Sequence, residues 1–107
     1  MRLTGKAEKD FFEWYRNTDF KSRNQPGLAL FYNYFDSMQY GVYLDFFDSV
    51  GIRIVIDMDF ENEVYDKFVL YIEYKKHCFC NYGMNFKTRQ EARTEGIKNA
   101  NEIYNLK

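Results

Sequence analysis

The first segment with a regular pattern of apolar residues is TGKAEKDFFEWYRN, residues 4–17. Apolar side chains at Ala7, Phe11, Trp14 and Tyr15 have helical spacing, and Thr4 stands where an N-cap is expected. The next residues, NTDFKSRNQPG, contain the only proline and favour turns. We therefore predict a helix over 4–17 and then a loop, while 28–35 fits either a short helix or an extended lead-in.

A second helix is predicted from 37 to 50, because Asp36 suits its N-cap and Gly51 the left-handed position after its C-terminus. At 100° per residue its apolar side chains cover an arc of about 240°. That arc comprises Met38, Tyr40, Val42, Tyr43, Leu44, Phe46, Phe47 and Val50. So wide an arc predicts two packed neighbours, the sheet on one side and another helix on the other. A homodimer in which two chains share this helix is the alternative.

After Gly51 the apolar period changes from 3.6 to 2, which is typical of strands. Residues 52–60 and 67–75 both alternate, and we predict that they pair as an antiparallel hairpin. A weaker strand is predicted at 77–84, with Lys75 and Lys76 at the turn before it.

The chain ends with an amphipathic segment in which Thr88 and Glu91 match a capping box. Its apolar stripe contains Ala92, Gly96, Ala100, Ile103 and Tyr104. The resulting order is helix, helix, strand, strand, strand, helix. It predicts one α+β domain over 1–107, with a three-stranded antiparallel sheet and the helices packed mainly on one face.

Composition and charge narrow the function classes. Aromatic residues make up 21% of the chain, well above ordinary usage, so aromatic packing dominates. Fifteen basic and sixteen acidic residues give a net charge of −1, which provides no general attraction to nucleic acid or anionic membranes. The polar N-terminus and the absence of a long apolar run predict a cytoplasmic protein with no membrane association.

The residues that could carry chemistry are few. His77, Cys78 and Cys80 invite a metal interpretation, but on a strand His77 faces away from the two cysteines and no further cluster completes four ligands. The acidic run that begins at Asp57 and Asp59 lacks a nearby base or a phosphate-binding loop. We therefore expect no catalytic residues, no metal and no cofactor, and hence no enzyme.

Binding residues are easier to nominate. The second face of the predicted sheet mixes aromatic, aliphatic and charged side chains, a combination that stacks bases or anchors a protein partner. The partner-binding candidates on this face are Arg53, Val55, Val69, Tyr71 and Phe79, and those on the second helix are Tyr40, Tyr43 and Phe47. Lys87, Arg89 and Arg93, near the start of the last helix, are candidates for nucleic-acid contact.

Two segments, DSMQYGVYLDFFDSVGI and TRQEARTEGIKNANEIYN, resemble small phage and prophage proteins of Bacteroides-group bacteria. This resemblance implies an origin in a mobile element and transfers no active site. The segment KTRQEAR is loosely similar to the start of the helix that follows the three-stranded sheet of double-stranded RNA-binding domains, with Glu91 where that family tends to be basic.

The resemblance to phage proteins implies a non-enzymatic interaction protein, of the kind that inhibits a host antiviral effector such as a CRISPR nuclease. A host protein or protein–RNA complex in the host cytoplasm is the expected partner. The alternative is a small RNA- or DNA-binding module that uses the basic residues of the last helix.

Overall fold

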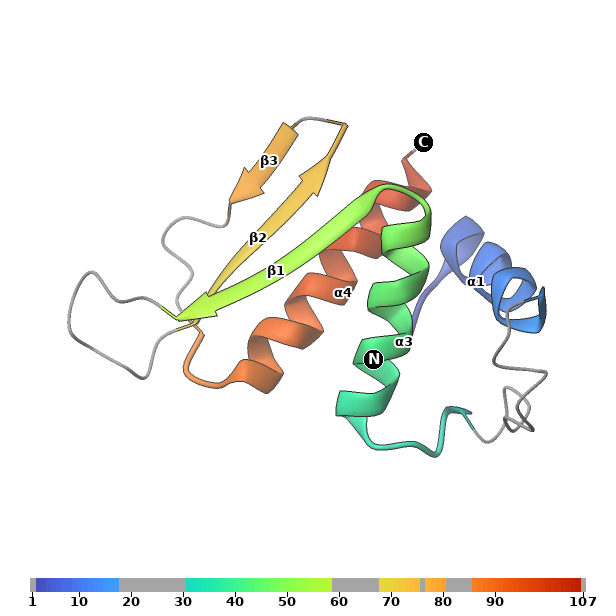
Figure 1. Cartoon of the computed structure of the whole chain (residues 1–107), viewed down its shortest axis with the longest axis horizontal. Helices are drawn as coiled ribbons and strands as arrows, with labels where there is room; N and C mark the ends of the chain where they lie inside the picture. The colour runs from blue at the N-terminus through green and yellow to red at the C-terminus, as the bar shows by residue number, and fades with distance from the viewer. Residues whose placement is uncertain (1, 18–30, 59–67, 76, 81–85, 107) are drawn as a thin grey trace.

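The computed structural model describes residues 2–17, 31–58, 68–75, 77–80 and 86–106, with backbone only at 58 and 77–80. Its elements follow in the order α1 (Gly5–Asn17), α3 (Asp36–Ser49), β1 (Ile52–Met58), β2 (Phe68–Tyr74), β3 (His77–Cys80) and α4 (Arg89–Asn105) (Figure 1). The predicted α+β class is confirmed. The predicted strand residues 59, 60 and 81–84 lie outside the described residues.

The first two strands pair antiparallel, as predicted, with Ile54 opposite Ile72 and Val55 opposite Tyr71. The short β3 pairs antiparallel with the other edge of β2. Lys75 has a positive φ of 50° in the connection between them. The even-numbered side chains Ile52, Ile54, Leu70 and Ile72 are buried, so this face of β1 and β2 belongs to the core.

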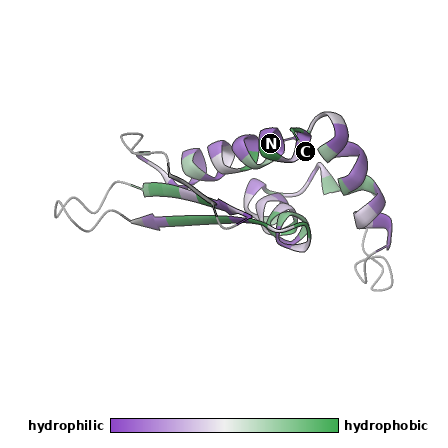
Figure 2. Cartoon of the chain, turned by 90° about the horizontal axis from the view of Figure 1, so that it is seen from above, coloured by the Kyte–Doolittle hydropathy of each residue, from purple (hydrophilic) through white to green (hydrophobic). Residues whose placement is uncertain are grey.

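Helix α4 covers that core face, and it lies on one side of the strands in Figure 2. The close approach of α4 to the two strands depends on Gly96. A Cβ atom at this position would lie 3.0 Å from Ile54 Cγ2 and 3.1 Å from Leu70 Cδ1, so the helix contacts both strands where it has no side chain. The expected apolar stripe of this helix is thus confirmed at its centre.

The wide apolar arc of α3 has two packed neighbours within one chain, as predicted. Helix α3 lies beside β1 and also contacts α4 and α1. Its fully buried rings, Tyr43, Phe46 and Phe47, join a cluster to which α1 contributes Phe11. The Phe11 ring centroid lies 4.9 Å from that of Tyr43 and 5.5 Å from that of Phe46. Aromatic contacts of this kind account for much of the aromatic excess.

The helix ends agree only in part with the predicted caps. Thr88 caps α4, since its side chain accepts a hydrogen bond from Glu91 N at 3.1 Å. The Glu91 carboxylate, however, accepts from Lys87 N instead of from Thr88 N. Gly51 has a φ of 84° after α3, as predicted. The prediction for Asp36 was wrong: Phe35 is the N-cap residue, and Asp36 opens the helix.

Helix α1 is attached to α4 by two asparagines. Asn101 accepts from Thr4 N at 2.8 Å and donates to Thr4 Oγ1 at 2.9 Å. Asn105 accepts from Ala7 N at 2.8 Å and donates to Thr4 O at 2.9 Å. A side chain of α4 therefore satisfies an amide in the first turn of α1, the role that the sequence suggested for Thr4.

Tyr104 adds a charge-assisted contact between the same helices, because its hydroxyl donates to Asp10 Oδ2 at 2.5 Å. Burial, the hydrogen bond to Asp10 and the charge of Asp10 together raise the pKa of Tyr104 from 10 to about 12. The folded state thus favours the neutral phenol. The contribution of this phenol to the free energy of unfolding is complete below pH 10 and is lost as the pH rises towards 12.

We expect Tyr104→Phe to lower the free energy of unfolding by about 1.5 kcal/mol at pH 7, the value typical of a hydrogen bond to a charged group. Urea titrations at pH 7, 10 and 11 would measure it. The difference between the wild type and the variant should shrink above pH 10, because only the wild type carries this phenol. A difference that stays constant or grows with pH would contradict the assigned role of the hydroxyl.

Candidate interaction surfaces

The face of β1 and β2 opposite α4 is open. Val55, Val69 and Tyr71 are half-buried at its centre, and Asp57 is exposed opposite Val69 in the strand register. We call this the open sheet face, and it comprises Arg53, Val55, Asp57, Val69, Tyr71 and Glu73. In the described part of the chain, α4 covers the other face of these strands, where Gly96 approaches the core residues Ile54 and Leu70.

One end of this face carries an ion pair. Arg53 lies opposite Glu73, and their charged groups are 3.7 Å apart. Both side chains are more than half exposed, so solvent screens the pair and it contributes little to stability. The structure thus brings together four of the five sheet candidates, Arg53, Val55, Val69 and Tyr71. Phe79 is paired in the backbone register with Ile72 of the core face, so the prediction that it belongs to the open face was wrong.

The candidates on the second helix are placed differently from what we expected. Tyr43 and Phe47 are 0% exposed and Tyr40 is 8% exposed, all within the core. Burial raises the pKa of the Tyr43 phenol well above its usual range. A side chain without accessible surface makes no contact with a partner, so the expectation that Tyr43 and Phe47 bind a partner was wrong, and Tyr40 is too deeply buried to anchor one. They hold α3 against its neighbours instead.

The basic candidates lie at the start of α4. Lys87 and Arg89 are exposed and Arg93 is half-buried. The guanidinium carbons of Arg89 and Arg93 lie 5.3 Å from the Phe68 ring centroid and 5.2 Å from the Tyr40 ring centroid, respectively. Burial raises the pKa of Tyr40, and Arg93 acts in the opposite direction. Both guanidinium groups thus lie within cation–π distance of an aromatic ring.

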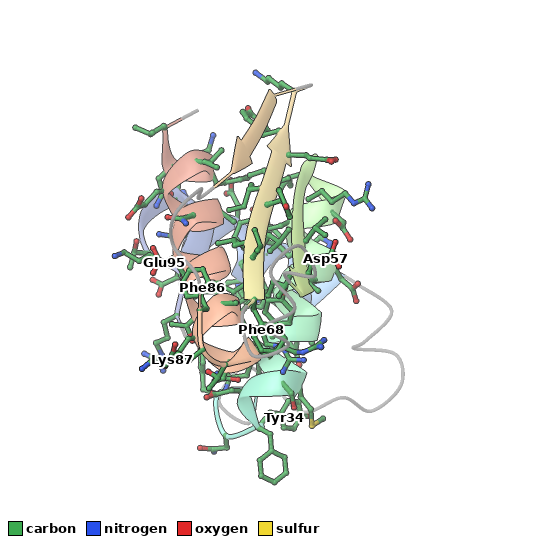
Figure 3. All side chains as sticks on the ribbon, turned by 90° about the vertical axis from the view of Figure 1, so that its left-hand side faces the viewer. Tyr34, Asp57, Phe68, Phe86, Lys87 and Glu95 are labelled. Atoms are coloured by element: carbon green, nitrogen blue, oxygen red, sulfur yellow. The ribbon has the colours of Figure 1, made fainter. Side chains whose placement is uncertain are left out.

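The start of α3 lies beside the start of α4. Gln90 Nε2 donates to Asp36 Oδ2 at 3.1 Å, and both helices begin at the lower end of the molecule in Figure 1. Figure 3 shows Tyr34, Phe68 and Lys87 towards this same end. Asp36 is thus a link between the two helices.

Two apolar side chains are exposed next to this link. Phe35 is 79% exposed and Met38, three residues later, is 50% exposed. We define the helix-end surface as Phe35, Met38, Lys87, Arg89 and Arg93. Sequence reasoning missed Phe35, and it included Met38 among the apolar residues of α3. The exposure of Met38 could have been predicted from its position at the edge of the 240° arc, where the two packed neighbours cover the helix least.

An open groove of about 670 Å³ lies between the N-terminal residues and α4. It is lined by Arg2, Thr4, Thr94, Ile97, Lys98, Asn101, Glu102, Asn105 and Leu106. The two asparagine side chains already bond to residues 4 and 7.

Within the described residues, no three or more His, Cys, Asp and Glu side chains gather in a way that could hold a metal ion. The side chains of His77, Cys78 and Cys80 lie outside this description. In the described part of the chain, no helix combines the length and the apolar character that crossing a bilayer requires.

Comparison of the chain with protein-family models, with curated proteins and with solved structures yields no match.

Proposed function

We propose that this chain is a non-enzymatic interaction protein that recognises a protein partner through its helix-end surface. The observation that carries this proposal is the exposure of Phe35 and Met38 at the start of α3, which Asp36 links to Gln90 of α4 between the two cation–π arginines. Aromatic residues, methionine and arginine are the types most enriched where proteins bind one another. In this proposal, the three-stranded sheet with helices mainly on one face serves as the scaffold.

The arginines make this surface suitable for a protein partner. The cation–π contacts of Arg89 with Phe68 and of Arg93 with Tyr40 favour one position of each guanidinium, which lowers the side-chain entropy that binding costs. Their guanidinium groups can donate several hydrogen bonds around the apolar centre formed by Phe35 and Met38. An apolar centre with a polar rim is the usual anatomy of an interface.

The resemblance to Bacteroides-group phage proteins supports one class of partner. A phage protein without catalytic groups acts by binding, and host antiviral effectors such as CRISPR nucleases are frequent targets. We therefore propose that the partner is such an effector, alone or with its RNA, and that binding inhibits it in the host cytoplasm.

The proposal predicts that Phe35→Ser with Met38→Ser weakens binding to a protein captured from a Bacteroides-group lysate by about 30-fold or more, the loss of about 2 kcal/mol expected of an interface hot spot. Calorimetry with the purified captured protein would measure this. Leu106→Ser is the matched control, since Leu106 is 86% exposed and belongs to the far end of α4. Equal affinity of the double variant and the control would contradict the proposal.

The rival function is nucleic-acid binding, and the exposure of Lys87 and Arg89 at the start of α4 favours it. Glu91 and the exposed Asp45 and Asp48 of α3 oppose it, because they repel phosphate. In a titration with double-stranded RNA, single-stranded RNA and DNA, an affinity that falls steeply with salt would support this rival. That affinity should be lost in Lys87→Glu with Arg89→Glu and kept in the Phe35 and Met38 variant.

A further inference from the structure

We propose that a second copy of this chain covers the open sheet face, giving a face-to-face homodimer with antiparallel β1 strands. The inference concerns a different surface from the helix-end surface and does not depend on the proposed function. It is carried by the order of side chains along β1, where Arg53, Val55 and Asp57 point to the same face.

This order is complementary to itself. A two-fold axis that lies between the copies, perpendicular to the strands and over Val55, reverses the direction of β1 in the second copy. It places Arg53 of each copy over Asp57 of the other and joins the two valines at the centre. The arrangement therefore forms an ion pair between the copies at each end of β1 and an apolar contact between these two ends.

Asp57 is the group that selects this arrangement. Glu73 already has Arg53 as a partner within the chain, whereas Asp57 forms no ion pair with another described residue. Figure 3 shows Asp57 on the opposite side of the strands from Glu95 of α4, so the helix does not obstruct its approach to a second copy. In the dimer, Arg53 of the second copy lies over Asp57 and forms an ion pair with it.

The apolar middle supplies the attraction. Val55 and Tyr71 are directly opposite in the register, and Val69 lies diagonally from Val55, so the three side chains form one continuous patch. Two sheets pack face to face through such residues about 10 Å apart. The ion pairs at the rim fix the direction, and the apolar patch contributes most of the affinity.

The size of the patch predicts a weak dimer. With about 3.3 Å of rise per residue and about 4.8 Å between strands, two seven-residue strands present roughly 220 Å². A stable interface uses about 800 Å² on each partner. Self-association is therefore expected to be reversible and to appear only at high protein concentration.

Sedimentation velocity of the full chain from about 1 µM to about 1 mM, the range that resolves weak association, would test the dimer. We expect the weight-average mass to rise from that of the monomer towards that of the dimer. A monomeric mass across the whole range would overturn the proposal. Tyr71→Ser should reduce association at least tenfold, whereas Asp45→Ser, on the exposed side of α3, should not change it.

Charge exchange tests the direction of the strands. Arg53→Glu with Glu73→Arg keeps an ion pair within each chain but places the new carboxylate at position 53 over Asp57 of the second copy. This double variant should lose the dimer, and the further change Asp57→Arg should restore it. If the double variant associates like the wild type, or if the triple variant stays monomeric, the proposed two-fold arrangement is wrong.

The thermal unfolding of each variant separates loss of association from loss of fold. The exchanged side chains of Arg53 and Glu73 are largely exposed, so we expect melting temperatures close to that of the wild type. Restoration by a change at position 57, four residues away along β1, cannot come from repair of the ion pair within the chain.

Discussion

Alanine in place of Phe46 is expected to lower the free energy of unfolding by about 3 to 5 kcal/mol, the usual cost of removing a buried phenylalanine ring. Phe46 is 1% exposed, and its ring contacts residues of α1, α3 and α4. Its centroid lies 5.6 Å from the Trp14 ring of α1, 5.2 Å from Phe47 of α3 and 5.7 Å from Tyr104 of α4. The cavity left by alanine would thus loosen the contact of α1 with the rest of the fold.

Urea unfolding followed by circular dichroism would measure this loss, which is a large part of the roughly 5 to 15 kcal/mol that stabilises a domain. Phe35→Ala is the control, since it removes the same ring from an exposed position and should change stability by less than about 0.5 kcal/mol. Equal midpoints for the two variants would show that Phe46 does not lie in the core.

Leucine in place of Gly96 is the second large effect, with an expected loss of about 3 kcal/mol. The first atom of any side chain here would already lie 3.0 Å from Ile54 and 3.1 Å from Leu70. The rest of a leucine would have to push α4 away from the sheet. Leucine favours helices more than glycine does, so its intrinsic preference opposes the loss and the measured cost is due to overpacking.

The variant Gly96→Ala separates the effect of helix propensity from the effect of overpacking. Alanine gains about 1 kcal/mol of helix propensity, and the small displacement of Ile54 and Leu70 offsets much of that gain. We therefore expect the alanine variant to remain close to the wild type while the leucine variant unfolds at much lower urea. A leucine variant as stable as the alanine variant would mean that α4 does not approach the strands this closely.

The α+β class and the hairpin could be predicted from the sequence because they depend on local periods. The 3.6-residue period of α3 changes to a period of 2 directly after Gly51, and the register of β1 with β2 follows the same alternation. The expectation that α3 has two packed neighbours also followed from this pattern, since an arc of about 240° exceeds what one neighbour covers.

The predictions of helix caps and of partner-binding residues were wrong where contacts between distant parts of the chain determine the structure. Thr4 and Asp36 were assigned as caps from local sequence, but their side chains bond to Asn101 and Gln90 of α4, which are distant along the chain. Tyr43 and Phe47 were nominated for a partner because periodicity shows that a side is apolar and does not show what covers it. The exposure of Phe35 carries no periodic signal, since it precedes the helix.

The two asparagines that attach α1 to α4 also determine when the N-terminal helix can reach its final position. The bonds of Asn101 and Asn105 to Thr4 join residues 97 and 101 positions apart. During synthesis, α1 leaves the ribosome before α4 and lacks this attachment until α4 has followed. Closing so long a loop makes the docking of α1 a late event in folding, and a truncation that removes residues 101–105 should remove these polar contacts of α1 even though its own sequence is intact.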